Sequence, residues 1–239
     1  MQALTLVLGI ETKAEYDSLR SQWVLNGSKI WITNGDIADL FTVFAKVFDH
    51  HSGKHVTTAF LVDKKFGGVT TGPNEKMMGI ECAHSVTVSF VDVKIPSSHI
   101  LGEIGQGFKI AMSTLNYGRF MIGVAMNSIM KKLLNICFNH VTSRIQFGKK
   151  LIEFEDIQYK IATMSSLIYA TETLIFYISG LIDATSRPFD LEVASLKIFS
   201  TESAWHICDE TIQILGGRGY MKANYNNSYF FRTMKLKKS

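Results

Sequence analysis

The hydrophobic pattern changes once along the chain, over residues 102–107, and this change constrains the fold more than any other feature. Before it, short runs rich in β-branched and aromatic residues alternate with polar positions, which is the two-residue period of a strand. After it, apolar residues recur every three or four positions, as in a helix that faces a core. The sequence therefore predicts an α+β protein. We expect an antiparallel β-barrel or sandwich domain over residues 1–101 and an antiparallel helical bundle over residues 102–239.

Turn residues divide the strand region. One hairpin turn is expected at Asn26–Gly27, between strands at residues 23–25 and 29–33, because both turn positions tolerate a positive φ. A second turn is expected at Asn34–Gly35. Further strands are predicted over residues 39–47, 57–62 and 85–90. This spacing is typical of a small antiparallel barrel or sandwich.

The helical region predicts three long helices with short joints. The first two span residues 107–141 and 155–182. The third follows Pro188, a favourable helix start, and ends at Gly216–Gly217, as a C-cap glycine would end it. The sequence after Tyr220 turns polar and then basic. Because bundles usually contain four helices, we expect the fourth to be missing from these residues.

Composition excludes several classes of function. The net charge of +4 is mild and much of it lies in residues 235–238, so no basic stripe predicts nucleic-acid binding. Neither the cysteines nor the histidines have metal-ligand spacing, and the odd cysteine count argues against a disulfide framework. We expect a reducing compartment, no metal, and histidines that are surface or core residues. The residues concerned are Cys82, Cys137, Cys208, His84, His140 and His206.

Nothing in the sequence predicts a targeting or membrane segment. No uninterrupted apolar run reaches the roughly 18 residues that a membrane span needs. Residues 1–10 are apolar but lack the basic start of a signal peptide and the Arg/Ser richness of a transit peptide.

The joint between the first two predicted helices, residues 144–149, contains an arginine and an aromatic residue three positions apart. The guanidinium of Arg144 is always charged and its planar fork of donors suits phosphate. Together with Phe147 it could hold the pyrophosphate of a nucleotide. A solvated arginine in an ordinary turn is the simpler interpretation of the hexapeptide alone.

Several motifs, taken together, favour a specific family. Residues 25–35, Leu-Asn-Gly-Ser-Lys-Ile-Trp-Ile-Thr-Asn-Gly, resemble the central β-domain signature of the acyl-CoA dehydrogenase family. The resemblance covers nearly all of the chain after about Ile10. Residues 37–46 and 66–78 look most like the very-long-chain branch and its relative that assists assembly of respiratory complex I. Further matches follow in the family order at residues 79–80, 88–90, 94–96, 100–108, 144–148 and 213–217.

The resemblance implies FAD as the cofactor. Trp31, Ile32 and Thr33 resemble the strand that lies against the flavin, with the Thr33 hydroxyl near the N5 edge. Ordinary strand core is the alternative for Trp31 and Ile32. The residues that resemble those holding the adenosine diphosphate half across a homodimer interface are Arg144, Phe147, Gln213, Gly216 and Gly217. The glycines permit close backbone approach to phosphate, and capping a helix is compatible with that role.

The resemblance also implies an acyl-CoA site. Asn116 and Arg119, one helical turn apart, resemble the pair that anchors acyl-CoA on the first long helix. An unpaired buried charge costs several kcal/mol. Arg119 is therefore expected either to extend to water or to meet an anionic partner.

The catalytic carboxylate of the family is not found here. In the family a glutamate removes the α-proton while the β-hydride passes to the flavin. That glutamate lies in a Phe-Glu-Gly-Thr-Asn stretch, but residues 232–239 occupy this region and Thr233 stands where the family has Asp. We therefore assign no catalytic residue and expect the glutamate beyond Ser239. We also expect truncation at the N-terminal end, where the all-helical domain is missing. The other glutamates of the helices, Glu172, Glu202 and Glu210, are not assigned as substitutes.

The expected parent function is FAD-dependent α,β-dehydrogenation of long or very-long acyl-CoA thioesters in fatty-acid β-oxidation, with this chain catalytically impaired. The family implies a homodimer in mitochondria, at the matrix or inner-membrane face, with electron-transfer flavoprotein as acceptor and possible peripheral membrane association. One alternative is a non-catalytic interaction or complex I assembly factor that uses an exposed bundle face. The other is a partial gene model without a function of its own.

Overall fold

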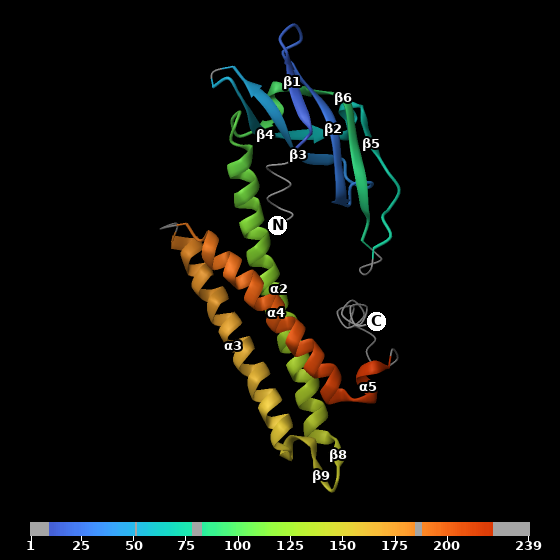
Figure 1. The fold of residues 1–239 in the computed structure, drawn as a ribbon, viewed down its shortest axis with the longest axis vertical. Coiled ribbons are helices and arrows are strands. Elements are labelled where there is room, and N and C mark those ends of the chain that lie inside the picture. The colour runs from blue at the N-terminus through green and yellow to red at the C-terminus, as the bar shows by residue number, and fades with distance from the viewer. Residues whose placement is uncertain (1–9, 51, 78–82, 185–187, 222–239) are drawn as a thin grey trace. The chain divides into compact units, whose positions relative to one another are not determined.

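The computed structural model describes residues 10–50, 52–77, 83–184 and 188–221. The chain divides into two compact units, Met1–Thr114 and Leu115–Ser239. The first contains a β-sheet and the second contains helices, as Figure 1 shows. The predicted order, a strand domain followed by a helical domain, is confirmed. The division between the units falls inside a helix.

In the described residues, seven strands form one sheet in the order β5-β6-β2-β1-β3-β4-β7. Neighbouring strands are antiparallel except β1 and β3, which are parallel, so the sheet is mixed and not purely antiparallel. The strands are β1 (Lys13–Asp17), β2 (Gln22–Thr33), β3 (Leu40–Asp49), β4 (Lys54–Asp63), β5 (Val69–Thr71), β6 (Ser85–Pro96) and β7 (Ile100–Leu101).

The β-domain core follows the two-residue period. Alternate residues of β3 point into it and are nearly inaccessible to water, because successive strand side chains face opposite sides of the sheet. The indole of Trp23 packs edge-on against the fully buried Phe60, with 5.6 Å between ring centroids. The buried β3 residues are Phe41, Val43, Ala45 and Val47.

The predicted hairpin turn at Asn26–Gly27 is wrong, because β2 runs through it without reversing. Residues 22–26 pair with β1, which the prediction had omitted. Gly27, at φ 142°, marks a register shift against β6. A Cβ on Gly27 would lie 2.7 Å from the Cα of Thr12, so this glycine permits close approach of another backbone segment.

The second predicted turn, at Asn34–Gly35, is confirmed. Asn34 has φ 61°, and the Gly35 amide donates a hydrogen bond to the Ile32 carbonyl at 3.2 Å. A Cβ on Gly35 would lie 2.8 Å from a methyl of Val86, so the turn packs tightly on β6. The end of β2 is thereby fixed against the start of β6.

The second unit contains the three long helices that the sequence predicted. They are α2 (Gly107–Ser143), which begins in the first unit, α3 (Glu155–Ala184) and α4 (Asp190–Leu215). The joint between α2 and α3 forms a small hairpin, β8 (Ile145–Gln146) with β9 (Lys149–Lys150), and α5 (Gly217–Tyr220) follows α4. The predicted absence of a fourth helix concerns residues 222–239, which lie outside the described residues.

Helices α2 and α4 run parallel in one register. Asn116 bonds to Asp190, a Cβ on Gly123 would meet Leu196 at 2.7 Å, and the Cys137 thiol bonds to Thr211 at 3.4 Å. The paired positions are 74, 73 and 74 residues apart, so the register persists along both helices. Helix α3 runs from the end of α2 back to the start of α4 and completes the core. Fully buried members of this core include Met130, Met164 and Ile207.

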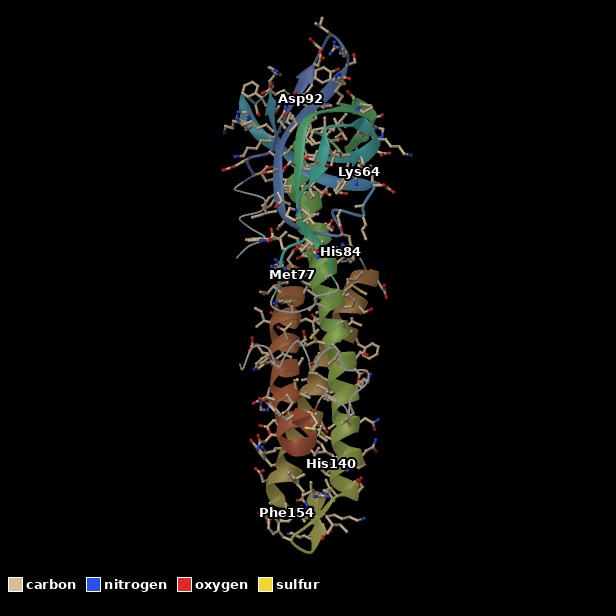
Figure 2. All side chains as sticks on the ribbon, turned by 90° about the vertical axis from the view of Figure 1, so that its right-hand side faces the viewer. Lys64, Met77, His84, Asp92, His140 and Phe154 are labelled. Carbon is tan, nitrogen blue, oxygen red and sulfur yellow. The ribbon has the colours of Figure 1, made fainter. Side chains whose placement is uncertain are left out.

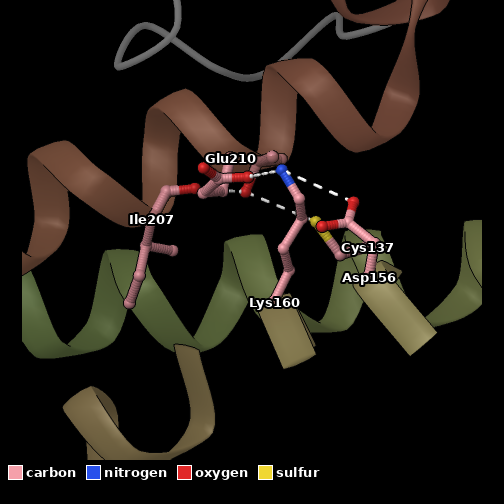
Figure 3. Close-up of polar contacts among 6 residues, drawn as sticks. Cys137, Asp156, Lys160, Ile207 and Glu210 are labelled. Carbon is pink, nitrogen blue, oxygen red and sulfur yellow. Dashed lines mark hydrogen bonds and ion pairs between the residues drawn. The ribbon is translucent and has the colours of Figure 1, made fainter. Parts of the chain in front are cut away.

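Lys160 of α3 and Glu210 of α4 form an ion pair where the two helices meet (Figure 3). The Lys160 ammonium lies 2.5 Å from a Glu210 carboxylate oxygen and 3.9 Å from Asp156. Burial raises the pKa of the Cys137 thiol to about 11 and that of Cys208 to about 12, so both remain protonated at neutral pH. Both are free thiols, whereas Cys82 lies outside the described residues.

By length and composition, α2 and α3 are each apolar enough to cross a membrane. A search for uninterrupted apolar runs does not detect this, because polar residues interrupt both helices. Long core helices of soluble proteins share the property, so it does not by itself identify a membrane protein.

Candidate cofactor site

The end of β2 carries the first group of predicted site residues. The register against β6 shifts between Lys29 and Ile32, and Trp31 has a φ of 57° there. Trp31 is 62% exposed and Thr33 is also exposed, whereas Ile32 packs partly against the core. The bulge thus leaves the Trp31 indole and the Thr33 hydroxyl exposed, while Ile32 packs partly against the core.

An Asp–His pair lies beside this strand end. The Asn34 amide donates to the His84 carbonyl at 2.8 Å, and the His84 Nδ1 atom lies 2.5 Å from an Asp36 carboxylate oxygen. The hydrogen bond from His84 lowers the pKa of Asp36 below its ordinary value. Sequence spacing did not reveal this pair because its members are 48 residues apart. The signal that could have revealed it is that Asp36 follows the end of β2 and His84, labelled in Figure 2, directly precedes β6.

Lys29, four residues before Thr33, is half-buried on the same strand. It pairs across the sheet with Val88, which is fully buried. In the described part of the chain its ammonium has no ion-pair partner, and desolvation lowers its pKa from 10.5 to about 8. The sheet therefore holds a poorly solvated cation near the predicted flavin strand.

A depression of about 750 Å³ opens elsewhere on the β-domain. Its walls include Tyr16, Trp23, Phe48 and His55, and none of Trp31, Ile32 and Thr33 lines it. Choosing a site by its concave surface alone would therefore miss Trp31, Ile32 and Thr33, the residues that the motif predicts.

The predicted acyl-CoA residues meet at the start of the parallel helix pair. The Arg119 guanidinium donates to the Asn116 side-chain oxygen at 2.9 Å, and the Asn116 amide donates to the Asp190 carboxylate. Asn116 is buried and Arg119 is half-buried. The structure thus brings the two predicted residues together and adds Asp190, which sequence spacing could not identify because it lies 74 residues away.

The predicted diphosphate residues gather at the other end of the same helices. Arg144 follows α2 directly and is exposed, and Phe147, with φ 52°, is 93% exposed in the hairpin turn. Gln213 is exposed in the last turn of α4. A Cβ on Gly216 or Gly217 would meet no atom of the described residues within 4 Å, so within that part of the chain nothing packs against this backbone.

The glutamates that sequence analysis left unassigned have other contacts or are exposed. Glu210 pairs with Lys160, and Glu172 accepts a hydrogen bond from Lys131. Glu202 is exposed on α4. Among the described residues, no group of three histidines, cysteines or carboxylates could hold a metal ion.

Comparison with known proteins identifies the family. Residues 2–93 match the family model described as "Acyl-CoA dehydrogenase, middle domain", and residues 105–238 match "Acyl-CoA dehydrogenase, C-terminal domain". The chain belongs to the acyl-CoA dehydrogenase family.

Individual relatives agree with this assignment. The chain is 46% identical over 217 residues to a mitochondrial very long-chain specific acyl-CoA dehydrogenase of Macaca fascicularis, a match that covers 89% of this chain and 33% of the relative. It therefore spans about a third of the length of that relative.

Two solved structures share the fold. Butyryl-CoA dehydrogenase from Megasphaera elsdenii superposes with a TM-score of 0.83 at 35% identity, covering 96% of this chain and 59% of the other. An acyl-CoA dehydrogenase from Bacillus anthracis, solved in complex with FAD, gives 0.81 at 33% identity, covering 97% and 42%.

Proposed function

We propose that the chain forms part of an FAD-dependent acyl-CoA dehydrogenase that oxidises long or very-long acyl-CoA thioesters at the α,β position in fatty-acid β-oxidation. The supporting observation is the parallel register of α2 and α4. It gathers an exposed arginine, an exposed aromatic ring and an open Gly-Gly backbone at one end of the bundle. These groups suit a nucleotide diphosphate.

The residues present fit FAD. Arg144 offers a bidentate cation, Gly216 and Gly217 leave space beside their backbone amides, and Trp31 and Thr33 are exposed. FAD, when bound, supplies the acceptor for the hydride. In this proposal Arg144, Phe147 and Gln213 hold the adenosine diphosphate half. Trp31, Ile32 and Thr33 border the flavin, where the Thr33 hydroxyl orients its reactive edge.

The acyl-CoA residues have a different place. Asn116 and Arg119 lie 28 and 25 residues before Arg144, which is about 40 Å along a helix. One bundle would therefore carry the acyl-CoA residues at one end and the adenosine diphosphate residues at the other. This separation supports a homodimer in which each copy completes the cofactor site of the other.

Chain-length preference, location and acceptor follow the relatives in this proposal. We infer a mitochondrial protein at the matrix or inner-membrane face that passes electrons to electron-transfer flavoprotein. In this proposal none of these residues is assigned as the proton acceptor of the family, so a polypeptide of these residues alone is expected to be catalytically impaired. Loss of a positioned general base alone costs about 10²–10⁴-fold in rate.

A flavin-binding measurement tests the proposal. The purified chain is titrated with FAD and followed by flavin fluorescence, and its turnover of palmitoyl-CoA is measured with an artificial electron acceptor. We expect FAD to bind, Arg144→Gln to weaken it about tenfold, and turnover to be far below that of a complete dehydrogenase. Lys132→Gln, which removes an exposed charge from α2, the helix that precedes Arg144, serves as control. Failure of FAD to bind the folded chain would overturn the cofactor assignment, and turnover comparable to a complete enzyme would overturn the impairment.

One observation favours a second function, that of a non-catalytic interaction or assembly factor. Helix α3 exposes three large aromatic side chains, Tyr159, Tyr169 and Phe176, by 69–74% each. A contiguous exposed apolar patch marks a partner surface, and Tyr169 and Phe176, seven residues apart, share one face of the helix. Affinity capture from mitochondrial extract, repeated with Tyr169→Lys and Phe176→Lys, should recover a partner that both variants lose. Recovery of chaperones alone would count against this function.

A further inference from the structure

Asp190, the first residue of α4, lies at one end of a chain of hydrogen bonds that leads to Arg119 on α2. The Asn116 side-chain amide donates to the Asp190 carboxylate, and the Asn116 side-chain oxygen accepts from the Arg119 guanidinium at 2.9 Å. Asn116, in the middle, is only 5% exposed. The carboxylate on one helix therefore reaches the guanidinium on the other through a single buried amide.

The chemistry of the outer two groups determines how that amide is turned. Asp190 stands in the first turn of α4, where the positive end of the helix dipole favours an ionised carboxylate. An ionised carboxylate can only accept hydrogen bonds, and a guanidinium can only donate them. Asn116 must therefore turn its NH₂ group to Asp190 and its oxygen to Arg119. Without Asp190 the buried NH₂ group would lose its partner.

Packing holds Asp190 in place opposite Asn116. The ring of Phe189, which precedes Asp190, packs against Tyr117 of α2 with 6.0 Å between ring centroids. Val193, one turn further along α4, is fully buried. The start of α4 is thus packed on α2 at the point where the hydrogen bonds cross between the helices.

Arg119 keeps its charge in this arrangement. Among the described residues its side chain forms no ion pair, and its hydrogen-bond partner is a neutral amide oxygen. A guanidinium paired directly with a carboxylate would be neutralised, whereas one that is held by an amide is oriented and still positive. Its remaining N–H donors are available to an anionic group.

We propose that Asp190 is a positioning residue of the acyl-CoA site, which acts through the Asn116 amide to hold the Arg119 guanidinium in the orientation that receives an anionic group of the ligand. This role rests on the proposed function of Asn116 and Arg119 and extends the site to α4. The charge of Asp190 alone would act in the opposite sense, because a carboxylate near an anionic ligand weakens its binding. Substitutions can therefore separate positioning from charge.

Calorimetric titration of the full chain with palmitoyl-CoA below its micelle concentration tests the positioning role. Asp190→Leu removes the acceptor and should weaken binding about tenfold, whereas Asp190→Asn keeps an acceptor oxygen and should stay within about threefold of the parent. In an Arg119→Gln background, Asp190→Leu should have no further effect. Asp183→Leu removes an exposed carboxylate from the last turn of α3 and is the control for charge.

Nuclear magnetic resonance with labelled arginine gives a measurement that needs no ligand. The Arg119 guanidinium signals, assigned with Arg119→Gln, should show restricted rotation in the parent and in Asp190→Asn, and faster rotation in Asp190→Leu. Asp190→Ala repeats the comparison without adding apolar surface at the start of α4, and urea midpoints establish that each variant is folded.

Tighter palmitoyl-CoA binding in both Asp190→Leu and Asp190→Asn, or Arg119 signals that Asp190→Leu and Asp190→Ala leave unchanged, would overturn the positioning role. The same measurements separate this role from the proposed function. A parent chain that binds no palmitoyl-CoA, but whose Arg119 signals respond to Asp190→Leu, would refute the acyl-CoA site and keep the positioning of Arg119. Binding that depends on Arg119 but not on Asp190 would do the reverse.

Discussion

Lys29 is expected to destabilise the β-domain at neutral pH. Its pKa falls from 10.5 in the unfolded chain to about 8 in the folded one, because the sheet desolvates the ammonium and no ion pair in the described residues compensates. One pKa unit corresponds to about 1.4 kcal/mol, so the difference is at most about 3.5 kcal/mol. Solvent still reaches this half-buried amine, which reduces the expected cost to roughly 1–3 kcal/mol.

The sign follows from proton binding. Below pH 8 both states hold the proton and the cost is constant, and above pH 10.5 both have lost it. Between these values the unfolded chain binds more protons, so stability rises with pH. Lys29→Met keeps a similar apolar length without the charge. It should raise the unfolding free energy at pH 7 by roughly 1–3 kcal/mol, a gain that disappears as pH approaches 10.5.

Urea denaturation at pH 7, 9 and 10.5, followed by tryptophan fluorescence, measures this gain. Hydrogen exchange of peptides from β2 and β6 identifies the transition of the β-domain. Lys94→Met removes an exposed lysine from the adjacent strand and is the matched control. A Lys29→Met variant that is less stable than the parent at pH 7, or whose gain is independent of pH, would refute the desolvation argument.

Three other substitutions test the packing. Because the hydrogen bond from His84 lowers the Asp36 pKa, the pair stabilises the fold above the ordinary carboxyl pKa, and this contribution is lost as pH falls through the lowered, folded-state pKa. Asp36→Asn should therefore lower the urea midpoint at pH 7, and by progressively less as pH falls below the ordinary carboxyl pKa. Gly27→Ala should cost roughly 1–3 kcal/mol in urea denaturation, since its Cβ would strike the Thr12 backbone. Met164→Ala should cost about 2–5 kcal/mol in thermal unfolding, because its side chain is fully buried.

The sequence predicted the features that depend on local periodicity. Helices of 26 to 37 residues repeat an apolar pattern many times, so their existence and approximate ends could be read directly. The predicted hairpin turn at Asn26–Gly27 was wrong because the Asn-Gly dipeptide occurs both in hairpin turns and at irregularities within a strand. The choice depends on Thr12, which approaches Gly27 from a distant part of the sequence.

The candidate sites depend even more on distant contacts. Motifs identified Asn116 and Arg119 through family resemblance, yet Asp190 could not be associated with them from spacing alone. A single shift of α4 by one residue along α2 would rotate its side chains by about 100° and separate these partners. The information lies in the packing of small and polar residues between the helices, such as Gly123 beneath Leu196.

The constant offset between α2 and α4 links the two ends of the helical bundle. The contacts at Gly123 and Cys137 keep the offset between α2 and α4 that places Asp190 beside Asn116. Enlarging Gly123 would displace Leu196 and disturb the Asn116–Asp190 contact without touching either residue. A bundle built this way requires a small residue at position 123, because the two parallel helices must keep their offset along their whole length.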